Sequence, residues 1–398
     1  MKKLVHIIVC AVYRDGWGYQ ENILPQKHKS LGYDVEIITY NQFKDQIHEQ
    51  NSCYKTSEGI TVHTLPTREH VVFDKIPIIR AFYGTSHNRT EGLYEKLNEL
   101  NPDIIFVHGI FMHDHYQVVD YVKNNPNVRL YVDNHSDYYN NPVSGLSGFL
   151  VIRPFGARIG KALSKYSRKI WAVTPWRLEY MQDIYKIPAS KSGLLVMGGD
   201  ETKIDYEHRS QIRQDIRKRF NIPEDCFLIV TGGKIDANKN IHFLVEAVNQ
   251  IKNRHIKLLI FGKFDSEMVN NPVFQYPCVI NAGWIAADKS YDYFLASDLA
   301  VFPGTHSVLW EQACASGIPG IFKDWDGGFN HVDVGGNAVL LKEISVKSIK
   351  SQIESLYFTP KYMNMLKVAQ DKGPKIFSYM EIAKRAIEFQ EFEEEDLN

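Results

Sequence analysis

The sequence lacks any long hydrophobic run, and its few cysteines are scattered. No apolar segment reaches the roughly 18 residues that a membrane-spanning helix needs. The apolar start, residues 1–12, is short, is interrupted by His6 and has no small-residue cleavage site after it. We therefore expect a buried strand there and not a signal peptide. The five cysteines form no Cys-x-x-Cys pair, which argues against a disulfide framework or structural zinc and favours the reducing cytosol.

An excess of either charge is also missing. Lys and Arg number 46 and Asp and Glu 47, a net charge of −1, which argues against a general nucleic-acid-binding protein. Apolar residues make up 44% and charged residues 23% of the chain, as in soluble globular proteins. At 398 residues the chain is too long for one ordinary core, so we expect two domains.

The first half alternates strands and helices. Residues 4–12 predict a strand, Gly16-Trp-Gly18 a tight loop, and the following segment a helix and then a strand at 35–39. This is a βαβ unit, and further strands are expected at 102–108, 128–133 and 170–174. The loop lacks the third glycine of a dinucleotide fingerprint, so a turn without a ligand stays the alternative to a cofactor loop.

The alternation restarts after a polar segment, 201–221. Strands are expected at 227–231, 257–262, 278–282 and 299–303, and helices at 241–251 and 290–296. Two such runs indicate an α/β protein with two doubly wound, Rossmann-like domains, 1–195 and 196–374. Segment 375–398 predicts a last amphipathic helix over 375–389 and an acidic tail at 391–398.

Residues 300–319 predict a buried strand, a turn at Pro303-Gly304 and a helix. Ser307 fits the N-cap position, so the first helical turn would direct unpaired N–H groups at the loop and form an anion site. Glu311 lies four residues further along the same helical face, close to any ligand whose phosphates lie at the helix start. A solvated glutamate is the alternative.

Two histidines follow strands of the first half. Ligands of open α/β sheets bind beyond the carboxyl ends of the strands, where His108 and His135 are expected. We interpret His108 as a hydrogen-bonded structural residue and His135 as a candidate for chemistry.

No acidic residue occurs between Tyr138 and Leu178, a stretch that holds seven basic residues. In segment 148–169 this charge alternates with aromatic and aliphatic residues, which suits an anionic membrane surface or a negatively charged acceptor. A solvated helix face is the alternative. The basic residues are Arg153, Arg158, Lys161, Lys165, Arg168, Lys169 and Arg177.

Taken together, several motifs resemble the retaining nucleotide-sugar glycosyltransferases of the GT-B fold, the family-four type of the glycosyl transferases group 1. Gly232-Gly-Lys-Ile-Asp-Ala-Asn-Lys239 is similar to the family's Gly-Arg-Leu-x-x-x-Lys element, and Glu311-Gln-Ala-Cys-Ala-Ser-Gly-Ile-Pro319 to its Glu-Ala-x-Ala-x-Gly-x-Pro helix. Phe377-Ser-Tyr resembles the closing Phe-Ser-Trp. Val196-Met-Gly-Gly-Asp200 is similar to the family's Asn-Gly-Val-Asp turn, Asn134-His135 to its active-site histidine, and Gly16-Trp-Gly18 to its first glycine loop.

The resemblance implies two facing domains with a cleft, an acceptor-side N-terminal domain, a donor-binding C-terminal domain and a last helix packing back toward the first domain. It assigns the donor diphosphate to Lys234, Lys239 and the N–H groups at His306–Leu309, and the ribose to Glu311. His135 would lie near the reacting sugar carbon, so the implied catalytic residues are His135, Lys239 and Lys234. The implied donor-binding residues are Gly16, Gly18, Gly233, Lys234, Lys239, His306, Ser307, Val308 and Glu311.

Two positions depart from the family pattern. Lys234 stands where the family usually has arginine, which would give a point charge in place of a bidentate fork. Pro303 stands eight residues before Glu311, where the family has a first glutamate, and His306 is the nearest candidate to replace it. The donor sugar therefore cannot be read by analogy.

The leading interpretation is an enzyme that transfers a hexosyl or N-acetylhexosaminyl group, with retention, from a UDP-sugar to a saccharide or a polyprenyl-pyrophosphate-linked acceptor. Such a step belongs to surface polysaccharide or glycoconjugate synthesis. We expect no metal and no cofactor, because lysines and a helix start supply the positive charge. The expected location is the cytoplasm, with the inner membrane face as a possible site of contact. A catalytically inactive GT-B-like binding subunit and a nucleotide-sugar epimerase are the alternatives.

Overall fold

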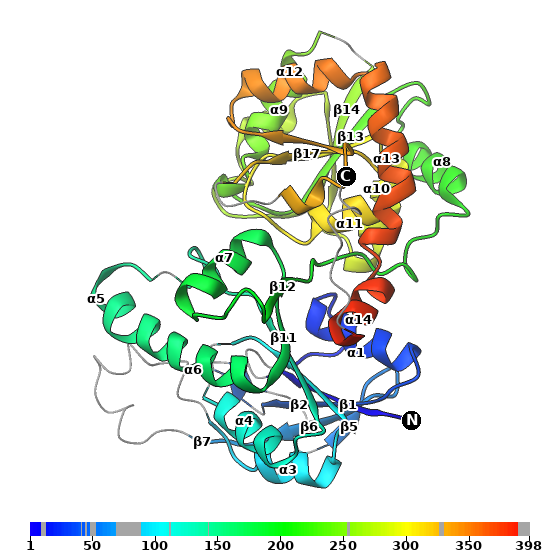
Figure 1. Cartoon of the computed structure of the whole chain (residues 1–398). Coiled ribbons are helices and arrows are strands. Elements are labelled where there is room, and N and C mark those ends of the chain that lie inside the picture. Colours follow the sequence, from blue (N-terminus) through cyan, green and yellow to red (C-terminus); the bar gives the residue numbers. More distant parts are fainter. Residues whose placement is uncertain are drawn as a thin grey trace. The chain divides into compact units, whose positions relative to one another are not determined.

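The computed structural model describes residues 1–8, 13–40, 42–43, 46–47, 53–68, 89–110, 113–141, 143–252, 255–325 and 330–388 (Figure 1). They form two compact units. Met1–Val196 and the end of the C-terminal helix from Ala383 on make the first unit, and Met197–Ile382 makes the second. The expected strand residues 9–12 and the acidic tail 391–398 lie outside the described residues.

The first unit is built on an eight-stranded sheet with the strand order β12-β11-β10-β9-β1-β2-β6-β5. All neighbouring strands are parallel except β5 with β6. The central strands are almost continuously apolar and buried, as expected for a parallel sheet covered on both faces. The strands are β1 (Lys3–Ile8), β2 (Asp34–Tyr40), β5 (Cys53–Lys55), β6 (Thr61–Leu65), β9 (Ile104–His108), β10 (Arg129–Asn134), β11 (Ser167–Ala172) and β12 (Ser192–Leu194).

Helices cover both faces of this sheet. Leu97, Val118 and Leu163, from α3, α4 and α6, pack on one face in a single hydrophobic core. On the other face His28 of α1 contacts His6, and the Trp171 indole N–H donates to the carbonyl of Ala386 in α14 at 2.9 Å. The helices are α1 (Gln20–Ser30), α3 (Leu93–Leu100), α4 (His115–Asn124), α6 (Arg153–Tyr166), α7 (Pro175–Ile184) and the end of α14 (Tyr379–Glu388).

The second unit is built on a six-stranded parallel sheet with the order β15-β14-β13-β16-β17-β18. One hydrophobic core joins strand residues such as Ile229 and Leu258 to Leu244 and Ile353 of the covering helices. The strands are β13 (Phe227–Ile235), β14 (Ile256–Phe264), β15 (Val279–Gly283), β16 (Leu299–Phe302), β17 (Gly320–Lys323) and β18 (Ala338–Leu341). The helices are α8 (Arg209–Arg219), α9 (Ile241–Gln250), α10 (Ser290–Ala296), α11 (Leu309–Ala315), α12 (Val346–Leu356) and α13 (Pro360–Ile376).

The predicted α/β class with two parallel-sheet domains is confirmed. The single helix expected over 375–389 is wrong, because α13 ends at Ile376 and α14 begins at Tyr379. The break has a hydrogen-bonding cause. The carbonyl of Phe377 accepts from Gly199 N at 2.9 Å, and Tyr379 N donates to the Gly199 carbonyl at 3.1 Å, so this stretch pairs with a distant strand-like segment in place of continuing the helix.

Candidate functional site

Two loops of the second unit meet at the carboxyl ends of the neighbouring strands β13 and β16. Thr305 N donates to the carbonyl of Asn238 at 3.1 Å. A Cβ added at Gly304 would lie 2.3 Å from the backbone of Lys239, so only glycine allows this approach. The two loops, far apart in sequence, therefore form one surface. A shallow pocket there is lined by Thr231, Gly232, Lys239, Ile241, Phe302, Pro303, Gly304, Thr305 and Ser307.

The glycine loop expected from residue 232 begins later than predicted. Strand β13 continues through Ile235, because its pairing with β14 extends to Ile235 opposite Phe264. Gly233 takes a φ of +103°, a conformation that favours glycine. The Lys234 side chain is 68% exposed, with its ammonium 3.2 Å from Asp236 Oδ2. Of the two lysines expected to bind the diphosphate, Lys234 is the more exposed to solvent.

Lys239 has a different environment. Its Nζ donates to the carbonyl oxygens of Thr305 at 2.7 Å and His306 at 3.2 Å, which ties the two loops together. Burial lowers the pKa of the Lys239 ammonium from its ordinary value to about 8, although Asp236 opposes this change. Lys239 thus lies at the expected place beside the turn, and the charge of its amino group is sensitive to pH near 8.

The helix after the turn starts later than expected. Helix α11 begins at Leu309, Val308 occupies the capping position with αR geometry, and no side chain caps the helix. The prediction that Ser307 is the N-cap is therefore wrong, because its carbonyl accepts from Trp310 N at 3.0 Å while its side chain caps no amide. Ser307 still lines the pocket, and Val308 precedes the helical amides that have no partner within the helix.

Glu311 is completely buried, so the alternative of a solvated glutamate is wrong. Its Oε1 accepts hydrogen bonds from Nε2 of His306 and Nε2 of His331, both at 2.8 Å. Burial alone would raise the pKa of the Glu311 carboxyl, but the two histidines outweigh it and lower the pKa to about 2. Oε2 has no hydrogen-bond partner among the described residues. The site thus holds an ionised carboxylate with one oxygen left to accept.

His306 was the sequence candidate for holding the donor sugar, and the structure places it against Glu311. His331, in the short turn Asn330–Val332, was missed. It lies 20 residues after Glu311, at no spacing that indicates a shared site, so no sequence signal could have found it.

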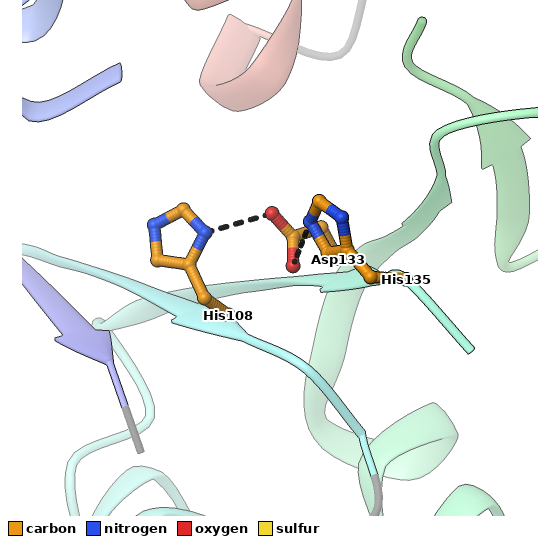
Figure 2. Close-up of side chains that lie close together, drawn as sticks. All are labelled: His108, Asp133 and His135. Atoms are coloured by element: carbon orange, nitrogen blue, oxygen red, sulfur yellow. Dashed lines mark hydrogen bonds and ion pairs between the residues drawn. The ribbon is translucent and has the colours of Figure 1, made fainter. Parts of the chain in front are cut away.

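In the first unit, Asp133 at the end of β10 joins the two histidines named from the sequence (Figure 2). Asp133 Oδ2 lies 2.8 Å from His108 Nδ1, and Oδ1 lies 3.4 Å from His135 Nε2. His108 is buried and hydrogen-bonded, in line with its structural interpretation. His135 is 32% exposed, so it is the member of this group that can reach a substrate.

Asp133 itself was not named as a site residue. The signal was present, because side chains alternate along a strand and Asp133 precedes His135 by two residues. Burial would raise the pKa of the Asp133 carboxyl, but the charges of His108 and His135 lower it, so Asp133 is ionised. Burial opposes protonation of His135, yet the carboxylate outweighs it and raises the His135 pKa.

Gly16 and Gly18 lie in a largely exposed turn of the first unit. Gly16 has a φ of +75°, and the neighbouring Trp17 is 44% exposed with the Arg14 guanidinium 5.3 Å from the centre of its ring. The other donor-binding candidates all belong to the second unit.

Two groups of described residues bring histidine and carboxylate atoms within 4.8 Å of one another: His108, Asp133 and His135, and His306, Glu311 and His331. In both, nitrogen atoms face carboxylate oxygens, with contacts of 2.8 Å that are hydrogen-bond lengths. We therefore interpret both groups as hydrogen-bonded clusters. The absence of a metal from the reaction stays a prediction.

The basic segment forms a π-helical turn, Gly148–Ile152, followed by α6. Phe149 and Leu150 are 70% and 58% exposed, and Arg158 and Lys161 are exposed on α6. The inclusion of Lys169 in this surface is wrong, because its side chain is buried with its ammonium 5.7 Å from the centre of the Trp171 ring. None of the described helices has the length and apolar character to cross a bilayer.

Residues 226–358, which contain both loops and Glu311, match the family model described as Glycosyl transferases group 1. This segment, about one third of the chain, is similar to that family, and the chain has a GT-B fold. The fold is similar to that of many solved structures at low sequence identity, among them the three that follow. No curated protein matches the chain in sequence.

Sucrose-phosphate synthase (tll1590) from Thermosynechococcus elongatus is 16% identical, with 98% of each chain covered and a TM-score of 0.64. A glycosyltransferase from Rickettsia africae ESF-5 is 14% identical, with 98% of this chain and 97% of that chain covered and a TM-score of 0.68. Anabaena Alr3699/HepE in complex with UDP is 12% identical, with 97% and 99% covered and a TM-score of 0.67. At these identities the structures establish the GT-B fold, and the domain match supports sugar transfer.

Proposed function

We propose that the protein transfers a sugar, with retention of anomeric configuration, from a UDP-sugar to a saccharide or lipid-linked acceptor. The observation that carries this proposal is the buried, ionised Glu311, whose Oε2 has no partner among the described residues. A buried carboxylate oxygen without a donor is costly, and a ribose hydroxyl would satisfy it. Anabaena HepE, which shares the fold, has been solved with UDP and with UDP-glucose, and this supports the choice of donor.

The donor diphosphate would bind over the joined loops. Lys234 and Lys239 supply positive charge, and the amides around Ser307 and Val308 supply hydrogen-bond donors. These groups stabilise the negative charge that develops on the diphosphate as the bond to the sugar breaks. The roles of Gly16, Gly18, Gly233 and His306 in donor binding belong to the same proposal.

His135 would act on the sugar or the acceptor. Asp133 raises the pKa of His135, which favours the imidazolium form. Because the ring is also partly exposed, it can donate a hydrogen bond to a substrate oxygen. This role fits the first unit, because the family resemblance assigns the acceptor to that unit.

A lipid-linked acceptor would be met at a membrane surface. Phe149 and Leu150 offer exposed apolar side chains next to the exposed cations Arg158 and Lys161. This combination favours shallow insertion into an anionic cytoplasmic membrane face, with each cation near the surface contributing on the order of 1 kcal/mol. Peripheral attachment is therefore part of the proposal.

One observation favours a second function, that of a binding subunit without catalysis. Pro303 stands where a donor-sugar carboxylate is expected, and the candidate replacement His306 is hydrogen-bonded to Glu311. The experiment that separates the two functions measures release of nucleoside diphosphate from a panel of nucleotide sugars without acceptor. We expect slow release from at least one UDP-sugar. Binding of UDP without release from any donor, with or without saccharide acceptors, would favour the binding subunit.

A further inference from the structure

Three buried histidines, His28, His6 and His108, form a hydrogen-bonded row that ends at the Asp133 carboxylate. His28 Nδ1 lies 3.0 Å from His6 Nε2, and His6 Nδ1 lies 3.0 Å from His108 Nε2. The rings stack with centroids 5.1 Å and 5.3 Å apart, against the ring of Phe106. All three histidines are at most 1% exposed. Figure 2 shows the end of the row where His108 meets Asp133.

Both ends of the row are fixed by acceptors. His28 Nε2 lies 2.8 Å from the carbonyl oxygen of Ala383, which can only accept a hydrogen bond. His108 Nδ1 lies 2.8 Å from Asp133 Oδ2, an ionised carboxylate oxygen that also can only accept. The nitrogen at each end must therefore carry a proton.

The number of protons in the row follows from these ends. Each of the two nitrogen–nitrogen contacts at 3.0 Å needs one proton between its partners. Two end protons and two internal protons make four, whereas three neutral imidazoles hold only three. With every contact satisfied, the row contains one proton more than three neutral rings carry.

We infer that the row His28–His6–His108 holds one buried imidazolium, on His108 beside Asp133, and that His6, His28 and His108 are positioning residues for His135. In this state His28 and His6 are neutral with the proton on Nε2, and His108 carries protons on both nitrogens. The carboxylate of Asp133 balances the charge, so the group as a whole is neutral.

The surroundings agree with this placement. Burial and the neighbouring histidines lower the pKa of His6 well below its ordinary value, and burial lowers the pKa of His28 to about 4, so both rings resist protonation. Among the described residues, the titratable groups that shift the pKa of His6 and His28 are the other histidines of the row, from α1, β1 and β9, and Asp133 of β10, and the Tyr33 ring lies 6.2 Å from the His28 ring. Glu21 and Arg177 act on His135 with opposite signs.

The extra proton on His108 affects the pKa of His135 through Asp133. One carboxylate faces both His108 and His135, so an imidazolium at His108 offsets part of the negative charge that His135 senses. Removing that proton would leave the Asp133 charge without a cation at His108, although Gly109 N still donates to Oδ1 at 3.0 Å, and would raise the pKa of His135. The row thus keeps His135 closer to neutral than Asp133 alone would. The effect on transfer rests on the proposed function, whereas the charge state of the row does not.

The charge state can be read directly in the unliganded protein. We expect long-range ¹H–¹⁵N spectra of ¹⁵N-histidine-labelled protein to show one buried histidine with both nitrogens protonated from pH 6 to 8. Two others should be neutral with the proton on Nε2. Spectra of single His6→Gln, His28→Gln and His108→Gln variants assign the signals. Three neutral rings at pH 7 would overturn the inference, whatever the protein catalyses.

Two pairs of variants test the effect on His135. Glutamine at position 28 can donate to the Ala383 carbonyl and accept from His6 Nε2, so the two remaining histidines still need three protons, one more than two neutral rings carry. In His28→Phe they need only two. We expect His28→Phe to abolish the doubly protonated signal and raise the His135 pKa by roughly one pH unit, and His28→Gln to do neither. His6→Gln and His6→Met form a second pair if His28→Phe fails to fold.

The control is His63→Gln, which changes a histidine paired with Glu36 on the opposite face of the same sheet. It should leave the His135 pKa unchanged. The pKa seen in the pH–rate profile of donor hydrolysis should shift together with the His135 pKa in His28→Phe. It should not shift in His28→Gln or His63→Gln. Equal behaviour of the Phe and Gln variants would overturn the positioning role. A shift in the His135 pKa without any donor hydrolysis in the unaltered protein would contradict the proposed function alone.

Discussion

The Lys239 amino group lies 2.7 Å from the carbonyl oxygen of Thr305, 66 residues away in the sequence. This contact holds a candidate phosphate cation on the turn that precedes α11 and keeps it partly dehydrated. The pKa of this amino group in the free protein is about 8, and the negative charge of a bound diphosphate should raise it.

Donor binding should therefore take up a proton near pH 8 to 9. The sign follows from linkage: the pKa is higher in the complex, so affinity is greatest below about pH 8 and falls as pH rises above it. Calorimetry of UDP binding in buffers of different ionisation enthalpy measures this uptake. Lys239→Gln should abolish it and Lys234→Gln should not. Proton release in the unaltered protein would contradict the account.

Glu311 should contribute to nucleotide binding and not to the chemical step. Glu311→Gln removes the charge, so affinity for UDP and for the donor sugar should fall by a similar factor of roughly 10-fold or more, with little change in kcat. UDP lacking both ribose hydroxyls supplies the matched control, because it should bind the unaltered protein as weakly as it binds the variant. Unchanged UDP affinity with lost turnover would mean that Glu311 acts elsewhere.

Turnover should not need a divalent cation. In the proposed function the positive charge near the diphosphate comes from Lys234, Lys239 and backbone amides. EDTA should therefore leave donor hydrolysis within about two-fold, while Lys239→Ala should reduce it about 100-fold. The chain has one Asp-x-Asp triplet, Asp324-Trp-Asp326, and Asp324→Asn tests it in parallel. Activity abolished by EDTA and restored by manganese would show that a metal carries the charge.

The exposed cations of α6 should attach the protein to anionic vesicles. Arg158→Glu with Lys161→Glu should reduce sedimentation with phosphatidylglycerol vesicles at low salt at least 10-fold, because each cation near the surface contributes on the order of 1 kcal/mol. Exposed Lys361 and Lys367 of α13, changed to glutamate, give a control with the same change in net charge. Equal binding of the two double variants would leave the α6 surface an ordinary solvated face.

The sequence allowed the fold and part of the site to be predicted, for identifiable reasons. Apolar runs and glycine turns located the central strands β1, β2, β9, β10 and β11 of the first sheet and β13 to β16 of the second, and the order of motifs indicated a GT-B fold. The short strands β5, β6, β12, β17 and β18 were not predicted. Periodicity also suggested one helix over 375–389, but the backbone pairing of Phe377 and Tyr379 with Gly199 divides it, and pairing between distant segments leaves no local pattern.

The same limit applies to the histidines. His135 was recognised by its place after a strand, whereas His6 and His28 contact one another only after α1 folds onto β1. The register of β1 and β9 places His6 beside His108, and the carbonyl that fixes His28 belongs to Ala383, more than 350 residues along the chain. The ionised state of buried Glu311 could not be predicted either, because its partner His331 lies 20 residues away at a spacing that indicates no contact.

The most direct test of the central claim is the anomeric configuration of the product. The protein would be incubated with α-linked UDP-sugars and a panel of saccharide and lipid-linked acceptors, and the new linkage followed by ¹H NMR before it can equilibrate. The account predicts transfer with an α-linked product from at least one donor, lost in Lys239→Ala. A β-linked product would contradict retention, and UDP binding without transfer or hydrolysis of any donor would contradict the enzyme itself.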